Sequence, residues 1–321
     1  MRLATLDNGT ADGALALISR DGQRALPAAG IADTLQQAVE RWVMIEPALR
    51  ALADRLEQGE GSPIDHDRLL APLPRAWQWL DGSAFPQHGA LMQKAFNLPP
   101  IETDRPLMYQ GLSDRFLPGH ADVPLPSEAD GIDFEGEYGV ITDAVPMGTP
   151  ADDALRHVKL VLLINDWSLR AIAPIEMKTG FGWVQAKPAC SLAPFAVTPD
   201  ALGDAWVDGR VHLPLQVMIN GQWFGHPHGR EMQFGFHDLI AHAARTRALP
   251  AGTIIGSGTV SNADYAKVGS SCISERRAIE AIRNGAPQTA FLSFGDTVRM
   301  DALGRDGSPF GTIDQRVVAA I

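Results

Sequence analysis

The chain has 321 residues, of which 45% are hydrophobic and 20% charged, so it holds enough apolar side chain to bury a substantial core. Its formal net charge of −11 argues against nucleic acid or an anionic membrane surface as a partner, because both require a basic surface. The chain starts without a signal-peptide pattern and no apolar run reaches the length of about 18 residues that a membrane span needs, so we expect a cytoplasmic protein.

The beginning of the chain predicts a small β-rich unit with a helix. The turn-rich DNGTADG separates the apolar runs MRLATL and ALALISR, a pattern typical of a β-hairpin. Apolar residues then recur every three to four positions from Ile31 to about Leu56, as on one face of a helix. Gly, Ser and Pro cluster over residues 59–75. We therefore expect an N-terminal domain over residues 1–70 and a second, larger domain over residues 71–321.

Strands dominate what we predict for the rest of the chain. Short apolar runs bounded by Gly, Asp or Asn occur in VHLPLQVMI, GTIIGSG, DTVRMDALG and GTIDQRVV. Two helices are expected between them. Thr149 and Pro150 fit an N-cap and a first helical residue for a helix through TPADDALRHVKLVLLI, and FHDLIAHAARTRAL has amphipathic spacing. The expected fold class is α+β and β-rich.

Acidic residues recur at every second position of GIDFEGEYGV, at Asp133, Glu135 and Glu137. Residues two apart in a strand share a face, so the side chains of Glu135 and Glu137 start about 7 Å apart and can converge. An isolated pair of this kind most often lies on a solvent-facing strand edge. Asp166 after VKLVLLIN and Asp81 within AWQWLDGSAF also lie in apolar surroundings, however. Four carboxylates near a core predict a hard divalent cation that offsets their repulsion.

Six stretches in this order together resemble the fumarylacetoacetate hydrolase family: WLDGSAFPQH, IDFEGEYGVI, LLINDWSLR, VQAKP, IIGSGTVSN and VGSSCISERR. The resemblance covers roughly residues 70–318, and the small N-terminal unit fits the bacterial fumarylacetoacetase-like branch. It implies a C-terminal mixed β-roll or β-sandwich domain and cleavage or related chemistry on 2-oxo or 1,3-dioxo acids. It also implies a homodimer. The family's metal ligands fall on Asp81, Glu135, Glu137 and Asp166, with Mg²⁺ expected and Ca²⁺ or Mn²⁺ as alternatives.

The resemblance also assigns catalytic roles. The family's base falls on His88, seven residues after Asp81, and the acid that orients it falls on Glu275 in SSCISERR. Arg170 and Lys187 match positions suited to a developing oxyanion and to substrate carboxylates. Cys190 and Cys272 are too few for a disulfide framework, and we expect both to be buried as small apolar side chains.

Four positions are expected on the substrate side of the site. Thr259 in GSGT is placed to hydrogen-bond a substrate carboxylate. Ser83, Ala173 and Met177 stand where animal fumarylacetoacetases carry tyrosine, glutamine and tyrosine. These departures remove hydrogen-bonding groups, and they predict loose substrate selectivity because apolar pockets discriminate weakly.

The first expectation for the reaction is hydrolysis of fumarylacetoacetate to fumarate and acetoacetate, a step of tyrosine and phenylalanine catabolism. Fumarylpyruvate or another acylpyruvate is the closest alternative substrate. A 2-oxo acid hydratase or decarboxylase of the same family is a further alternative, but it would not need the water-activating pair of His88 and Glu275. A non-enzymatic, metal-stabilised binding protein is the distant alternative, because four carboxylates suffice for a structural ion.

Overall fold

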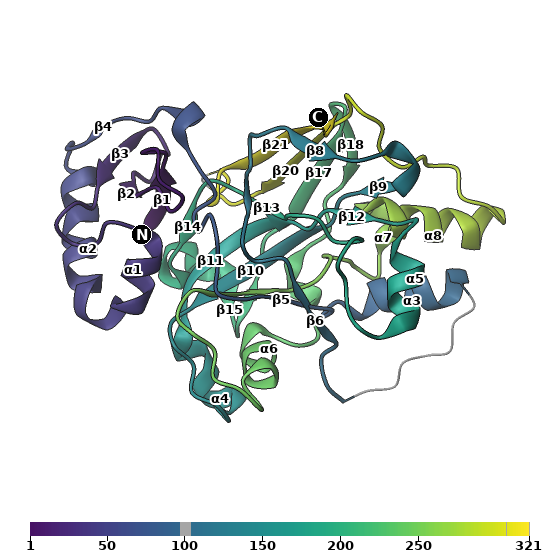
Figure 1. The fold of residues 1–321 in the computed structure, drawn as a ribbon, viewed down its shortest axis with the longest axis horizontal. Coiled ribbons are helices and arrows are strands. Elements are labelled where there is room, and N and C mark those ends of the chain that lie inside the picture. The colour runs from purple at the N-terminus through teal and green to yellow at the C-terminus, as the bar shows by residue number, and fades with distance from the viewer. Residues whose placement is uncertain (97–103, 306, 321) are drawn as a thin grey trace.

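The computed structural model describes residues 1–96, 104–305 and 307–320, and a large mixed β-sheet runs through its centre (Figure 1). The sheet has twelve strands, and its main path runs β4-β3-β2-β1-β14-β11-β10-β19-β5-β6; off this path β13 pairs with β11 and β7 pairs with β13. In chain order the strands are β1 (Arg2–Leu6), β2 (Ala14–Ile18), β3 (Arg24–Pro27), β4 (Ser62–Pro63), β5 (Trp79–Gly82), β6 (Met108–Gly111), β7 (Leu117–Pro118), β10 (Gly136–Thr142), β11 (Val158–Asn165), β13 (Ser191–Leu192), β14 (Ala196–Val197) and β19 (Thr253–Gly256).

A second sheet of five strands has the order β18-β17-β20-β21-β8. Its strands are β8 (Val123–Leu125), β17 (Leu215–Ile219), β18 (Gln222–Gly225), β20 (Thr297–Ala302) and β21 (Thr312–Ala319). Two short pairs complete the described strands, β9 (Ile132–Asp133) with β12 (Ser168–Leu169) and β15 (Trp206–Val207) with β16 (Arg210–Val211). The fold is thus mixed α+β and strand-rich, as the sequence predicts.

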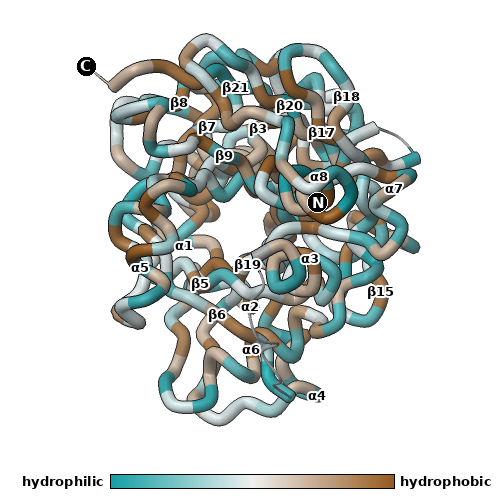
Figure 2. Tube along the Cα trace, turned by 90° about the vertical axis from the view of Figure 1, so that its right-hand side faces the viewer, coloured by the Kyte–Doolittle hydropathy of each residue, from teal (hydrophilic) through white to brown (hydrophobic). Residues whose placement is uncertain are grey.

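The described helices surround these sheets. They are α1 (Leu35–Glu40), α2 (Trp42–Glu57), α3 (Pro86–Phe96), α4 (Ala151–Ala154), α5 (Ala173–Thr179), α6 (Phe236–Ala243), α7 (Tyr265–Val268) and α8 (Ile273–Asn284). In Figure 1, α3, α5, α7 and α8 gather on the side away from the N-terminal unit, and Figure 2 looks onto that side. There Leu91 of α3 packs against Ala278 and Ile279 of α8. In the described parts of the chain, no helix is both long and apolar enough to cross a membrane.

The central strands β10 and β11 are covered on both faces. Val140 and Leu163 belong to a core shared with Val217 and Met300 of the five-stranded sheet. Neighbouring residues of β10 and β11 point to the other face and belong to a second core, which is shared with the N-terminal helices. They are Ile141, Leu160, Leu162 and Ile164. Burial on both faces explains why β11, VKLVLLIN, is a nearly continuous run of apolar residues.

The predicted N-terminal hairpin and helix are confirmed, with one break. β1 and β2 pair antiparallel from Arg2↔Ile18 to Leu6↔Ala14. The predicted helix is two helices, because Arg41 has non-helical backbone angles between α1 and α2. β1 also pairs with β14, so the large sheet continues across residue 70. The division into domains at residue 70 stays a prediction.

The helix predicted through TPADDALRHVKLVLLI is largely wrong. Only Ala151–Ala154 is α-helical, a 3₁₀ turn follows over Leu155–His157, and Val158–Asn165 is strand β11. Pro150 takes the N-cap position in place of Thr149. The run VKLVLLIN has the length and burial of a central strand, and short apolar runs of this kind do not distinguish strand from helix. The helix predicted in FHDLIAHAARTRAL is confirmed, but it ends at Ala243.

Candidate metal centre and active site

Three buried carboxylates meet where neighbouring strands of the large sheet end. Asp81 lies in β5, Glu137 is the second residue of β10, and Asp166 follows β11 directly. The pairing Gly136↔Asn165 brings the start of β10 beside the end of β11, and β19 places β5 in the same region. One oxygen from each carboxylate lies within 4.8 Å of those from the other two.

Gly256 allows Asp81 to approach the cluster. It lies opposite Asp81 in the parallel pair of β19 and β5. A Cβ atom at this position would lie 2.4 Å from Asp81 Oδ1 and 2.3 Å from the Trp79 ring. The backbone N–H of Gly258 donates to Asp81 Oδ1 at 3.1 Å. Only glycine fits at residue 256 without displacing the carboxylate.

The electrostatics of this carboxylate cluster, Asp81, Glu137 and Asp166, favour a bound cation. Burial, followed by repulsion from Asp166, raises the pKa of Asp81 to about 8. Burial also raises the pKa of Glu137 well above its usual range, and the charges of Asp81 and Asp166 add to this shift. Apart from a proton shared with Asp81, neither oxygen of Glu137 has a hydrogen-bond donor among the described residues. Because a buried carboxylate without a donor is costly, and three carboxylates here lie close together, the site fits a hard divalent ion.

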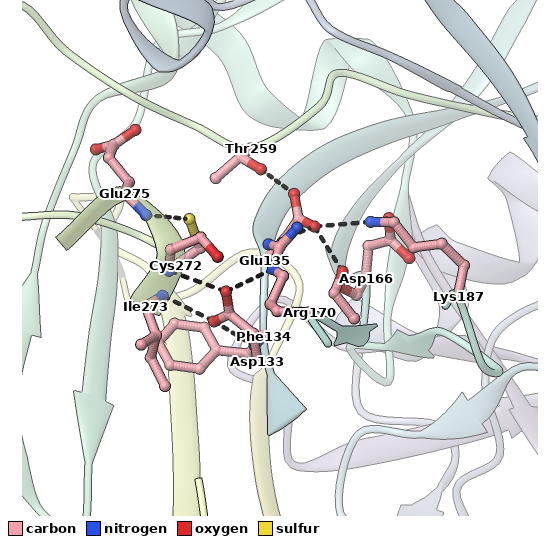
Figure 3. Close-up of polar contacts among 12 residues, drawn as sticks. Asp133, Phe134, Glu135, Asp166, Arg170, Lys187, Thr259, Cys272, Ile273 and Glu275 are labelled. Atoms are coloured by element: carbon pink, nitrogen blue, oxygen red, sulfur yellow. Dashed lines mark hydrogen bonds and ion pairs between the residues drawn. The ribbon is translucent and has the colours of Figure 1, made fainter. Parts of the chain in front are cut away.

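Glu135 lies beside the carboxylate cluster and is held by cations (Figure 3). Its Oε1 accepts hydrogen bonds from Arg170 Nη2 at 2.8 Å and Lys187 Nζ at 2.7 Å. The same oxygen accepts from Ser168 Oγ at 2.6 Å, and Oε2 accepts from Thr259 Oγ1. Burial alone would raise the pKa of Glu135, but the charges of Arg170 and Lys187 outweigh it and hold that pKa well below its usual range.

The predicted convergence of Glu135 and Glu137 along one strand therefore needs correction. Glu135 lies between β9 and β10, where it bridges to Cys272, so the two glutamates do not belong to one regular strand. Glu137 belongs to the carboxylate cluster, whereas Glu135 accepts hydrogen bonds from Arg170 and Lys187. The role of Glu135 as a metal ligand stays a prediction.

Asp166 has three donors, and two of them were not predicted from the sequence. Lys187 Nζ and the hydroxyl of Tyr109 each donate to its Oδ2 at 2.6 Å. The thiol of Cys190 donates to its Oδ1 at 3.0 Å. Tyr109 lies opposite Asp81 in the β5–β6 pair, a register that the sequence alone does not reveal. Cys190 is buried, as predicted, but it also contacts the site.

The structure brings His88 and Glu275 together across 187 positions of sequence. His88 is in the first turn of α3, and its Nδ1 lies 3.0 Å from Glu275 Oε2. Glu275 is fully buried in the first turn of α8, where its N–H donates to the Sγ of the N-cap residue Cys272. His88 is also close enough to Glu135 to contribute to its low pKa. His88 thus lies near both Glu275 and Glu135.

The residues predicted on the substrate side are more dispersed. Thr259 is buried against Glu135. Ser83 is exposed directly after β5, Ala173 is buried at the start of α5, and Met177 is 61% exposed on the same helix. A substrate-binding role for these residues stays a prediction.

The raised pKa of Asp81 makes the stability of the metal-free protein pH-dependent. Between its ordinary value of 3.8 and about 8, folded Asp81 holds a proton that the unfolded chain has released. That stabilisation is complete below the lower value and is lost as the pH rises through the upper one. We expect the melting temperature of metal-free protein to fall from about pH 5 to about pH 9, and bound divalent metal to reduce this fall because the ion replaces the proton. Thermal melts with and without metal across this range test it, and parallel curves would contradict it.

Two family models together match nearly the whole chain. Residues 78–318 match the family described as "Fumarylacetoacetate (FAA) hydrolase C-terminal", and residues 1–75 match "Fumarylacetoacetase N-terminal domain 2". The mitochondrial oxaloacetate tautomerase Fahd2a of Rattus norvegicus is 26% identical over 157 residues, 48% of each chain. The 2,4-didehydro-3-deoxy-L-rhamnonate hydrolase of Sphingomonas sp. strain SKA58 is 28% identical over 163 residues, 50% of this chain and 54% of that protein. The chain thus matches about half the length of these curated relatives.

A solved structure of similar fold spans the full chain. It is the maleylpyruvate hydrolase from Sphingobium sp. SYK-6 in complex with manganese(II) ion and pyruvate, with a TM-score of 0.68, 16% identity and 100% coverage of both chains. At this identity the likeness establishes the fold.

Proposed function

Because the chain belongs to the fumarylacetoacetate hydrolase family, we propose that it is a divalent-metal-dependent enzyme that hydrolyses a carbon–carbon bond of a 1,3-dioxo acid. The observation that carries this proposal is the combination of two features. A cluster of buried carboxylates fits a metal ion, and His88 is held by a buried glutamate nearby. A structural ion would need only the first feature.

The ligands of the proposed ion are Asp81, Glu137 and Asp166, with Glu135 as the predicted fourth. When bound, a divalent cation supplies Lewis-acid polarisation of substrate carbonyl oxygens. Mg²⁺ is our first choice, and the manganese in the maleylpyruvate hydrolase of similar fold supports Mn²⁺ as an alternative. The predicted homodimer is part of the same proposal.

The residues of the chain supply proton transfer and charge stabilisation. Glu275 accepts the Nδ1–H of His88, which leaves Nε2 as the base that takes a proton from water. Burial opposes the charge of Lys187, but the carboxylates of Asp166 and Glu135 outweigh it and raise the pKa of this lysine, so it is a cation at neutral pH. Lys187 and Arg170 would then donate to the negative oxygens that develop on the substrate.

Fumarylacetoacetate is our first candidate substrate, and an acylpyruvate is the second. The maleylpyruvate hydrolase of similar fold supports the second candidate. The similarity to an oxaloacetate tautomerase raises a third reaction, because a histidine base can also move a proton between carbon and oxygen. Hydrolysis and tautomerisation are separated by their products. Incubation of a panel of 1,3-dioxo and 2-oxo acids with Mg²⁺ or Mn²⁺ should yield two acids from one, identified by mass, and isomerisation without cleavage would contradict the proposal.

We predict loose selectivity between the two candidate substrates. Ser83, Ala173 and Met177 are smaller or apolar where animal fumarylacetoacetases carry tyrosine, glutamine and tyrosine, and apolar contacts discriminate by only about 1–3 kcal/mol per methylene. Fumarylacetoacetate and at least one smaller acylpyruvate should have kcat/KM values within about two orders of magnitude of each other. Both values are measured on one preparation. A preference beyond about 10⁴ would show that other polar groups bind the distal carboxylate.

A further inference from the structure

Asp133 is a fully buried carboxylate that the proposed reaction does not yet use. Its Oδ1 accepts from the backbone N–H groups of Phe134 at 2.8 Å and Ile273 at 2.7 Å. Its Oδ2 accepts from the backbone N–H of Ser274 at 2.9 Å and from Arg170 Nε at 2.8 Å (Figure 3). These four donors satisfy the hydrogen-bonding capacity of an ionised carboxylate.

These donors belong to three different parts of the site. Asp133 ends β9, which pairs with β12 through Ser168↔Asp133, and this pairing brings Arg170 alongside. Ile273 and Ser274 are the first two residues of α8, where N–H groups have no partner within the helix and a negative charge is favourable. The next residue of the helix is Glu275, which contacts His88.

Asp133 therefore contacts both the start of α8, which carries the partner of His88, and Arg170, which contacts Glu135. On one side, the start of α8 carries Glu275 and through it His88. On the other, the guanidinium of Arg170 bonds Asp133 through Nε and Glu135 through Nη2 at 2.8 Å. A guanidinium fixed at two points has a defined orientation, which a single ion pair would not give.

We propose that Asp133 is a positioning residue, which fixes Glu275 and His88 relative to Arg170 and Glu135; this inference rests on the proposed hydrolase function. The chemical step depends on this relation, since a misplacement of about 1 Å can cost about 10²-fold in rate. A carboxylate that only capped α8 would stabilise the helix and leave the rate constant unchanged when removed.

The first test is Asp133→Asn in the metal-loaded enzyme. The amide keeps the shape of the side chain but turns an N–H₂ group toward N–H donors. We expect kcat to fall about 10- to 100-fold while KM changes by less than about threefold, because positioning acts mainly in the transition state. The matched control is Asp238→Asn, which alters another carboxylate in the first turn of a helix, where it accepts from the N–H of Gly235. It should lower the melting temperature and leave kcat unchanged.

Double-mutant cycles then test whether Asp133 acts through its neighbours. Asp133→Asn is combined with Arg170→Lys and, separately, with Glu275→Gln. If the residues act as a unit, each double variant should be no more than about threefold slower than its slower single variant. Losses in kcat that multiply in either cycle would overturn the proposal.

Amide hydrogen exchange tests the contact between Asp133 and α8 without substrate, so its result does not depend on the reaction. Arg170→Lys leaves Asp133 and α8 intact but removes the Nε donor. The freed carboxylate should hold α8 less firmly, so amide hydrogen exchange at Ile273 and Ser274 should accelerate about tenfold. Unchanged exchange would overturn the coupling. If instead wild-type enzyme cleaves no dioxo acid, the proposed function fails, and the exchange rates still decide the role of Asp133.

Discussion

Removal of divalent metal with a chelator is expected to abolish turnover, and Mg²⁺, Mn²⁺ or Ca²⁺ should restore at least part of it. The reason is the carboxylate cluster, in which burial and mutual repulsion raise the pKa values of Asp81 and Glu137. Without a cation these groups hold protons, and the substrate oxygens lose the charge that would polarise them. Steady-state rates before and after chelation, with metal content measured on the same samples, test this. Full activity in metal-free protein would contradict it.

Two glutamine variants make the metal prediction more specific. Apart from a proton shared with Asp81, both oxygens of Glu137 lack donors among the described residues, whereas those of Glu135 accept from several donors. Glu137→Gln should therefore weaken metal affinity more than Glu135→Gln does, because it removes a carboxylate that no cationic side chain in the described structure neutralises. Metal titrations by calorimetry on the two variants compare them directly. The opposite order would make Glu135 the stronger ligand.

His88→Ala is expected to retain metal and lose about 10²-fold or more in turnover, as for the loss of a general base. The Nδ1 contact with Glu275 leaves the other ring nitrogen as the base, and His88 is not part of the carboxylate cluster. Turnover and metal content of the variant are measured together. Loss of metal from this variant would make His88 a ligand.

Two further variants test whether His88 acts as a base or only stabilises the fold. Glu275→Gln should also slow turnover, since it removes the carboxylate that orients His88. His157 makes a similar contact, with its Nδ1 2.7 Å from Asp143 Oδ1, and is buried. His157→Ala is thus the matched control, and it should affect stability without changing kcat. An equal loss of kcat in this control would point to general destabilisation.

Much of the fold could be predicted because local pattern and burial agree. The hairpin of β1 and β2 consists of two apolar runs separated by a turn-rich loop, and α6 has one apolar face. β11 could not be assigned in this way, since its run of apolar residues reflects burial on two faces rather than a period. The break at Arg41 was also missed, because the apolar spacing continues through it.

The proximity of the candidate site residues was predictable where each residue lies in a recognisable sequence motif. His88 and Glu275, and the cluster of Asp81, Glu137 and Asp166, came from ordered motifs. Contacts that depend on strand register were not predictable. Tyr109 reaches Asp166 because β6 pairs with β5, and Glu135 lies in the interruption between β9 and β10.

The pairing of β1 with β14 has a consequence for how residues 71–321 would behave in isolation. The join is made by main-chain hydrogen bonds at Arg2↔Val197 and Leu3↔Ala196. A fragment without the N-terminal unit would present unpaired backbone groups along β14 and the apolar side chains of Leu160 and Leu162 beside them. Open strands of this kind recruit other chains. In the full chain the N-terminal unit pairs this edge and covers these side chains, so we expect the fragment, and not the full chain, to self-associate through β14.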